Sequence, residues 1–175
     1  MPGRLVAIVG PSGAGKDTVL DGLRVALAGD AGFVFARRVI TRPATAGGEA
    51  HEAVTEAEFA GRDLALSWSA HGLRYGIPRG IEAEIDSGRQ VLANLSRAVL
   101  AEAAARYPLA VLEITAPPAV LAAWLAARGR DDAADIAARL AREAPLPAGL
   151  TVLRVMNDGT PEAAVRQALA LLRAG

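Results

Sequence analysis

The segment Gly10-Pro-Ser-Gly-Ala-Gly15-Lys16-Asp17-Thr18 constrains the fold of this 175-residue chain more than any other feature. A short apolar run at 5–9 precedes it, and apolar residues at helical spacing follow it. This order of strand, glycine loop and helix is the context that a P-loop requires. Glycines let successive backbone N–H groups turn toward phosphate oxygens, and the helix N-terminus adds partial positive charge. The segment therefore predicts a binding site for a nucleoside triphosphate.

Lys16 is the only lysine among 19 cationic residues, and the other 18 are arginines. An ammonium is a compact point charge that suits the β- and γ-phosphates, whereas a planar guanidinium fits such a cradle poorly. The alternative is a glycine-rich turn that opens an ordinary helix. The strand-to-helix context and the position of the one lysine after these glycines favour phosphate binding.

Asp17 departs from the usual P-loop pattern. The residue after the lysine is normally Ser or Thr, whose hydroxyl binds Mg²⁺. Here it is Asp17, and Thr18 follows. A carboxylate is a good Mg²⁺ ligand, so we hypothesise that Asp17 contacts Mg²⁺ directly or through water. The alternative is that Asp17 only interacts with the dipole at the start of the helix.

The composition narrows the class of protein. Nineteen acidic residues balance the 19 basic ones, so no global field favours nucleic acid or an anionic membrane. The lack of cysteine excludes disulfides, thiolate metal sites and a cysteine nucleophile. No apolar run is long enough for a membrane span or signal peptide. We expect a cytoplasmic protein with small-molecule partners. Its alanine-rich helices could pack in the core or at a subunit interface, so the sequence leaves the oligomeric state open.

Strand and helix patterns alternate along the chain. We expect strands at 5–9, 33–39, 65–69, 91–95, 109–115 and 151–156. We expect helices at 17–27, 56–61, 81–87, 97–107, 118–128, 132–144 and 161–172. Alternation of this kind predicts an α/β fold, a three-layer sandwich with a mostly parallel sheet, in one domain spanning 1–175. Its ligands should lie at the carboxyl ends of the strands.

Two segments carry arginines that could hold anions. The first, at about 37–81, is interpreted as an acceptor-binding insertion, in which Arg38 and Arg42 could converge on one phosphate. The second, at about 128–139, is interpreted as a lid that carries Arg128, Arg130 and Arg139 over the triphosphate. The alternatives are a solvated basic edge and surface charge on alanine-rich helices. A lone Trp68 or Tyr75 is more often core packing than a ligand contact.

The sequence offers no strong candidate for a catalytic base, and its two histidines are His51 and His71. An alcohol acceptor would benefit from a base. An acceptor that is already an ionised phosphate needs only positioning and charge neutralisation. The sequence therefore favours a kinase that acts on a phosphate group.

The chain resembles guanylate kinase-like P-loop kinases over almost its whole length. The matching segments are GPSGAGKDT, ITRP, VTEAEF, the Tyr-Gly pair at 75–76, RGRDDAADIAARL and VMNDG. The resemblance implies that Arg42 grips the acceptor phosphate with help from Tyr75, and that Arg128 and Arg139 act in the lid. It also implies that Asn157 and Asp158 lie by the adenine of ATP.

Departures from guanylate kinases point to a different acceptor. The positions that read guanine with carboxylates are neutral here, at Ser67 and at 93–96. Thr45 replaces a phosphate-gripping arginine, and His51 replaces a tyrosine that touches the same phosphate. Arg38 and Arg97 add cations. Guanine's N–H donors would stay unpaired in such a site, which suits an acceptor without a base and with more negative charge.

One branch of this superfamily matches that description. The GKD form of the loop, ITR, ALSWSAHGLRYG, NLSRAVL and RGRDDAADIAARL resemble the ribose 1,5-bisphosphate phosphokinases of bacterial phosphonate metabolism. The resemblance implies transfer of the ATP γ-phosphoryl group to the 1-phosphate of ribose 1,5-bisphosphate, with Mg²⁺ present. We hypothesise that Arg38 or Arg97 holds the 5-phosphate, with Arg74 a weaker candidate. The alternatives are a guanylate kinase, another small-molecule kinase, or a non-catalytic binding module.

These interpretations define the candidate site. The catalytic candidates are Lys16, Arg128 and Arg139. The ATP-binding candidates are Gly10, Pro11, Ser12, Gly13, Ala14, Gly15, Lys16, Asp17, Thr18, Arg128, Arg130, Asn157 and Asp158. The acceptor-binding candidates are Arg38, Arg42, His51, Tyr75 and Arg97, and Asp17 is the metal-ligand candidate.

Overall fold

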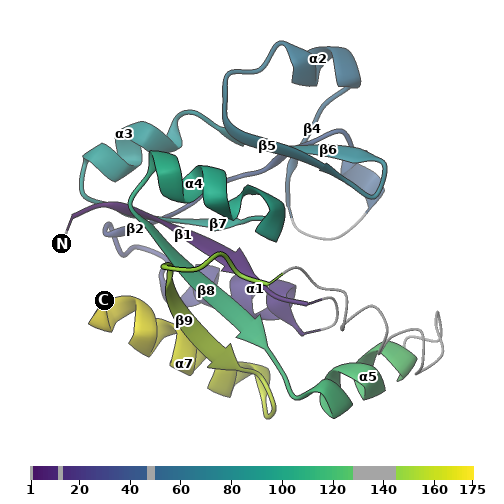
Figure 1. Ribbon diagram of the computed structural model, residues 1–175, viewed down its shortest axis with the longest axis vertical. Coiled ribbons are helices and arrows are strands. Elements are labelled where there is room, and N and C mark those ends of the chain that lie inside the picture. Colours follow the sequence, from purple (N-terminus) through teal and green to yellow (C-terminus); the bar gives the residue numbers. More distant parts are fainter. Residues whose placement is uncertain (1, 12–13, 47–49, 128–144) are drawn as a thin grey trace.

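A computed structural model describes residues 2–11, 14–46, 50–127 and 145–175 (Figure 1). Its central sheet has five strands, and each pair of neighbouring strands is parallel. In sheet order these strands are β2 (Phe33–Phe35), β7 (Gln90–Asn94), β1 (Arg4–Val9), β8 (Leu109–Thr115) and β9 (Thr151–Met156). Strands β1, β7 and β8 are mostly apolar runs because helices or loops cover both of their faces. The mostly parallel α/β sheet predicted from the sequence is confirmed.

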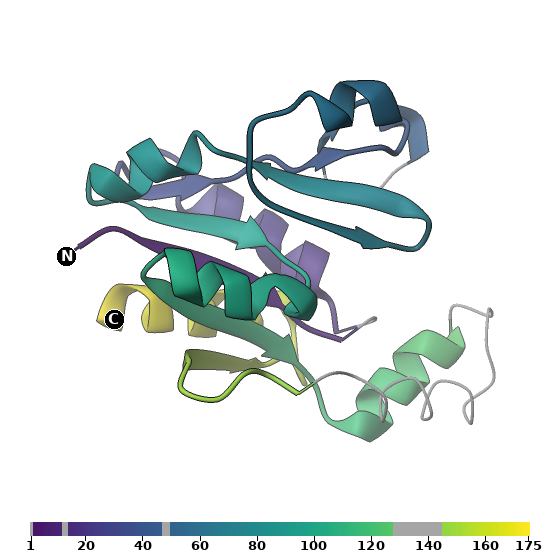
Figure 2. The ribbon, with the colours of Figure 1, turned by 45° about the horizontal axis from the view of Figure 1, so that its top comes forward.

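Helices pack on both faces of this sheet. On one face α1 (Lys16–Ala26) and α7 (Pro161–Ala174) bury apolar residues against Val6 and Ile8 of β1. The other face carries α3 (Ile81–Asp86) and α4 (Leu100–Arg106), which pack with Leu5 and Ala7. Alternate residues of a strand point to opposite faces, so β1 contributes to two separate cores. Figures 1 and 2 show α1 and α4 on opposite sides of β1.

A second, four-stranded sheet is built from the predicted insertion. Its order is β4 (Glu52–Ala53), β3 (Val39–Ile40), β6 (Leu73–Pro78) and β5 (Leu64–Ala70). Strands β5 and β6 form an antiparallel hairpin whose two turn residues, His71 and Gly72, have φ of 53° and 73°. Positive φ at both turn positions matches the twist of the flanking strands. A 3₁₀ turn (Ala44–Ala46) and α2 (Glu56–Ala60) complete this part of the chain.

Some element boundaries differ from the prediction. A single strand at 33–39 is wrong, because β2 pairs with β7 in the central sheet whereas β3 pairs with β6 in the second sheet. The predicted helix at 97–107 is a 3₁₀ turn (Arg97–Val99) followed by α4. Strands β4 and β6 were not predicted. Helix α5 (Pro118–Ala127) begins as predicted, and the helix predicted at 132–144 lies outside the described residues.

Side-chain caps stabilise the first turns of α2 and α7. At α2, the Glu58 N–H donates to Thr55 Oγ1 at 3.2 Å, and the Thr55 N–H donates to Glu58 Oε2 at 2.7 Å. At α7, the Ala163 N–H donates to Thr160 Oγ1 at 3.2 Å. Within the described ranges, the helices are all too short or too polar to cross a membrane.

Candidate functional site

The P-loop follows β1 at the carboxyl end of the central sheet, and two glycines allow its close packing. A Cβ on Gly10 would lie 2.2 Å from the Ile114 carbonyl oxygen of β8. Gly15 precedes α1 with a φ of 77°, and a Cβ there would lie 2.6 Å from Asn157 Nδ2. A larger residue at either position would collide with backbone or with a buried amide. Ser12 and Gly13 lie outside the described residues.

Asn157 braces this loop from the end of β9. Its side chain is buried, and Nδ2 donates a hydrogen bond to the Ala14 carbonyl at 2.8 Å. Its backbone N–H donates to the Thr115 carbonyl at 2.7 Å. Asn157 therefore ties the P-loop to the two strands beside it. Its contact with adenine stays a prediction, as does that of Asp158, which is exposed.

A cavity of about 660 Å³ separates the P-loop from the second sheet. The described residues that line it come from the P-loop, the β5–β6 hairpin, and the segments after β2 and β7. Those with polar or aromatic side chains are Lys16, Asp17, Thr18, Arg38, Trp68, His71, Tyr75, Asn94, Ser96 and Arg97. Lys16, Arg38 and Arg97 bring three cations, and Asp17 is the one carboxylate among these residues. This balance favours an anionic ligand.

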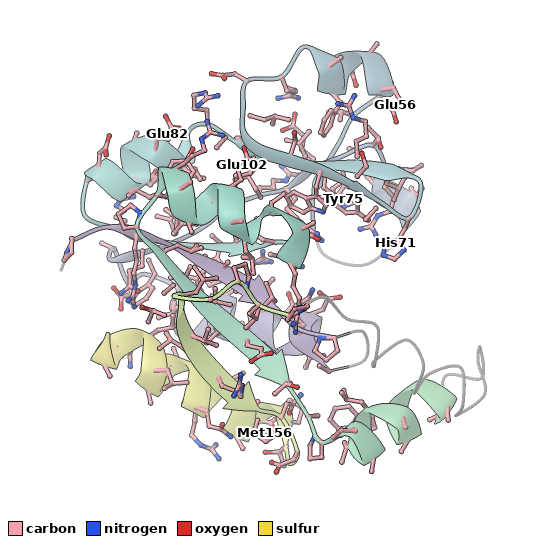
Figure 3. The ribbon with its side chains drawn as sticks, viewed as in Figure 1. Glu56, His71, Tyr75, Glu82, Glu102 and Met156 are labelled. Carbon is pink, nitrogen blue, oxygen red and sulfur yellow. The ribbon has the colours of Figure 1, made fainter. Side chains whose placement is uncertain are left out.

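An aromatic pair forms part of the cavity wall. Trp68 on β5 lies opposite Tyr75 on β6, and their rings stack with centroids 5.5 Å apart and an interplanar angle of 5°. The Arg38 guanidinium carbon lies 5.3 Å from the centroid of the Tyr75 ring. Cation–π attraction of this kind holds a guanidinium in place. Figure 3 shows Tyr75 on the hairpin and His71 at its turn.

Trp68 is a cavity residue that sequence reasoning assigned to core packing. Its indole does pack against the buried cluster of the sheet, but it also lines the cavity. The signal was present in the sequence, since a two-residue turn at His71-Gly72 places Trp68 directly across from Tyr75. Cross-strand aromatic pairs are a common stabilising feature of hairpins. Recognising the hairpin would have predicted the pair.

Arg42 and His51 form a separate contact beside the cavity-lining set. His51 is buried, and its Nε2 lies 2.9 Å from the Arg42 carbonyl oxygen. Arg42 Nη2 lies 3.5 Å from His51 Nδ1, and Arg37 Nη2 donates to the His51 carbonyl at 3.1 Å. Arg42 Nε is buried and lacks a hydrogen-bond partner among the described residues. A bound phosphate oxygen would satisfy such a donor.

The acceptor candidates therefore divide into two groups. Arg38, Tyr75 and Arg97 line the same cavity as Lys16, whereas Arg42 and His51 contact each other outside its described lining. Arg74, the weaker candidate for the 5-phosphate, is engaged with α2. Its Nη1 lies 3.7 Å from Glu56 Oε2, and its guanidinium carbon lies 4.4 Å from the centroid of the Phe59 ring.

Named proteins of high similarity identify the family. The chain is 54% identical over 171 residues to "Ribose 1,5-bisphosphate phosphokinase PhnN" of Acidiphilium cryptum, covering 97% of this chain and 92% of that protein. It is 48% identical to the protein of the same name from Methylobacterium radiotolerans, covering 99% of each chain. This chain belongs to the ribose 1,5-bisphosphate phosphokinase family. None of the protein-family models searched matches it.

Some relatives in the ribose 1,5-bisphosphate phosphokinase family are longer. "Bifunctional ribose 1,5-bisphosphokinase-thymidine phosphorylase" of Cupriavidus necator is 50% identical over 179 residues. That match covers 99% of this chain, which spans 30% of the bifunctional protein. The kinase family thus includes proteins in which a region like this chain accompanies much additional sequence.

Solved structures of other kinases have a fold similar to that of this chain. Guanylate kinase from Anaplasma phagocytophilum superposes with a TM-score of 0.66 at 19% identity, covering 98% of this chain and 85% of that one. A gluconokinase from Sinorhizobium meliloti gives a TM-score of 0.51 at 18% identity, with 99% and 93% covered. At these identities the likeness concerns the fold, and the predicted guanylate kinase-like P-loop fold is confirmed.

The cradle fits a triphosphate with a magnesium ion. Lys16 begins α1, and Asp17 and Thr18 line the cavity beside it with oxygen atoms that suit a hard cation. Within the described ranges, groups of three or more acidic, histidine or cysteine residues that could hold a metal do not occur. A metal ion here would take most of its ligands from phosphate and water. The lid candidates Arg128, Arg130 and Arg139 lie outside the described residues.

Proposed function

We propose that this chain transfers the γ-phosphoryl group of ATP to the 1-phosphate of ribose 1,5-bisphosphate. The products are 5-phosphoribosyl 1-diphosphate and ADP. The observation that carries the proposal is one cavity in which the P-loop residue Lys16 shares the lining with Arg38 and Arg97. The named relatives, which match over nearly the whole chain, support the same acceptor.

The donor phosphates belong on the P-loop in this proposal. Backbone N–H groups of the loop and the Lys16 ammonium bind the β- and γ-phosphates, where glycine alone permits the necessary close packing. Asp17 or Thr18 would hold Mg²⁺, which supplies charge neutralisation for the triphosphate. Asn157 keeps the loop in shape through the Ala14 carbonyl.

The acceptor belongs among the arginines opposite. An oxygen of the ionised 1-phosphate forms the new bond to the γ-phosphorus, and the bond from that phosphorus to the bridging oxygen of ADP breaks. No proton has to leave the acceptor, so Arg38 and Arg97 act by positioning and charge compensation. We assign Arg42, with His51 beside it, to the acceptor phosphate as well, because its buried Nε would gain a partner there.

The proposal also includes residues whose contacts with a ligand are predicted from the sequence. Arg128, Arg130 and Arg139 would close over the phosphates and neutralise charge between donor and acceptor. Asn157 and Asp158 would lie near the adenine. We further propose a single-domain cytoplasmic enzyme whose partners are ATP and a sugar phosphate, with neither nucleic acid nor membrane involved.

The test is an ADP-release assay coupled to NADH oxidation, with ribose 1,5-bisphosphate and GMP compared as acceptors. We expect turnover with the bisphosphate and at most background with GMP. A Lys16→Ala variant serves as the blank for contaminating kinases. Turnover with GMP alone would make the protein a guanylate kinase. The lack of turnover with either acceptor, combined with no ATP binding by calorimetry, would make it a binding module.

A further inference from the structure

Glu113 interrupts an otherwise buried strand and has no role in the site described above. It lies in β8, whose sequence LAVLEIT is apolar except at this residue and the terminal Thr115. Val111, two residues earlier, packs in the core cluster on the face that carries α4. Because alternate residues share a face, Glu113 points to the same side. Burying a carboxylate there costs desolvation free energy unless partners compensate its charge.

Two arginines provide that compensation. Arg97 Nη2 donates to Glu113 Oε1 at 3.3 Å, and Arg154 Nε donates to Glu113 Oε2 at 2.7 Å. Arg97 comes from the 3₁₀ turn that precedes α4, and Arg154 pairs in register with Glu113 on the neighbouring strand β9. Each carboxylate oxygen therefore faces a different part of the fold.

The two contacts differ in burial and in position. The side chains of Glu113 and Arg97 are 10% and 17% exposed, whereas that of Arg154 is 61% exposed. Arg97 lines the cavity that contains Lys16, and Arg154 is not among the described residues that line it. The three side chains thus form a row that begins on the exposed strand β9 and ends at the cavity.

This row fixes the direction of a guanidinium. The five N–H donors of arginine are held in one plane, so a carboxylate contact at one edge orients the whole group. The carboxylate also compensates one of the two positive charges, which leaves the row with a net charge of one cation. A partly buried contact is screened less by solvent than a surface ion pair.

We infer that Glu113 is a positioning residue that aims Arg97 at the phosphates of the acceptor. The inference rests on the proposed function, because it takes the cavity to hold an anionic sugar bisphosphate. Glu113 itself touches no substrate in this account. Its effect should therefore disappear when Arg97 is absent.

The first experiment measures steady-state kinetics of Glu113→Gln with ATP and ribose 1,5-bisphosphate. Glutamine keeps the shape of the side chain but removes its charge, so we expect the KM for the bisphosphate to rise about tenfold. The KM for ATP and kcat should stay within about twofold, because an interaction made equally in ground and transition states affects KM alone. Arg154→Gln is the matched control, since it removes the other partner of Glu113 and should leave both KM values within about twofold.

The second experiment separates positioning from a structural role. Arg97→Ala and the double variant Arg97→Ala/Glu113→Gln should show the same KM for the bisphosphate, because Glu113 acts through Arg97. A further rise in the double variant equal to that of the single Glu113→Gln change would overturn the inference. An equal rise of both KM values in Glu113→Gln would overturn it as well. If Glu113→Gln does not fold, Glu113→Asp retains the charge and retracts it by one methylene, and a rise in the acceptor KM alone is again expected.

The outcomes distinguish this inference from the proposed function. Turnover of the bisphosphate by the wild-type protein with no change in Glu113→Gln would refute positioning and leave the function standing. Turnover of GMP in place of the bisphosphate would refute the function, and the same KM ratios measured with GMP would still decide the role of Glu113. If neither acceptor is phosphorylated, calorimetric titration with pyrophosphate decides the role of Glu113. We expect weaker pyrophosphate binding in Glu113→Gln and unchanged binding in Arg154→Gln.

Discussion

The P-loop and the second sheet face the same cavity but are built in different ways. The P-loop residues are contiguous in sequence, and their backbone shape depends on glycines packed against β8 and Asn157. The opposite wall combines Arg38, Trp68 and Tyr75, which come from separate segments and hold one another through ring contacts. The proposed donor site is therefore one continuous segment held in shape by the distant Asn157, whereas the proposed acceptor wall is assembled from several segments. Substitutions on the two sides should affect different kinetic constants.

The largest expected effect belongs to Lys16. Replacing it with alanine should lower kcat by about a thousandfold, because it removes a preorganised charge from the transferring phosphates. Lys16→Arg should fail to restore activity, since a planar guanidinium does not fit the cradle of a compact ammonium. Initial rates at saturating substrates test both variants. A kcat within tenfold of wild type in either variant would contradict the proposed role of Lys16 in the donor site.

Arg38 tests the opposite wall. In Arg38→Ala we expect the KM for ribose 1,5-bisphosphate to rise about thirtyfold, because a charge-assisted hydrogen bond to the acceptor is lost. The KM for ATP should not change. Tyr75→Leu should show a smaller rise in the same constant, because the ring that holds Arg38 is lost. Both constants are measured in one coupled assay. Equal changes in the two KM values would show that the walls are not independent.

Asn157 tests the brace of the P-loop. In Asn157→Ala the buried Ala14 carbonyl loses its donor, which should raise the KM for ATP about tenfold. The acceptor KM should stay within about twofold. Gly15→Ala should act in the same direction, because its Cβ would displace the Asn157 amide. An effect of Asn157→Ala on the acceptor KM alone would contradict the proposed division of the cavity.

The smallest effect concerns stability, away from either wall. Burial and a hydrogen bond to Glu82 raise the pKa of Tyr107 to about 12, and the Tyr107 hydroxyl donates to Glu82 Oε1 at 2.7 Å. A phenol whose pKa is raised in the folded state contributes stability below pH 10, which is lost as pH rises toward 12. Tyr107→Phe should lower the free energy of unfolding by about 1 kcal/mol at pH 8 and flatten its decline above pH 10. Urea titrations across this pH range give both values, and unchanged kinetics at pH 8 serve as the control.

The sequence predicts those parts of the molecule that are determined by residues close together in the chain. Continuous apolar runs indicate the strands of the central sheet, Thr55 and Glu58 indicate the start of α2, and the glycine motif indicates the P-loop. Several features that depend on distant neighbours were not predicted. The break between β2 and β3 depends on which sheet each strand joins, and the stack of Trp68 on Tyr75 depends on an unrecognised hairpin. The role proposed for Glu113 depends on its contacts with Arg97 and Arg154, which lie far from it in the sequence.

A crystal structure with ADP and ribose 1,5-bisphosphate bound together tests the central claim most directly. We expect the β-phosphate of ADP in the P-loop next to Lys16. We expect the 1-phosphate of the sugar to face it from the side of Arg38 and Arg97. A sugar bound outside this cavity would contradict this arrangement. So would a parallel soak with GMP in which the guanine fills the position of the sugar at full occupancy.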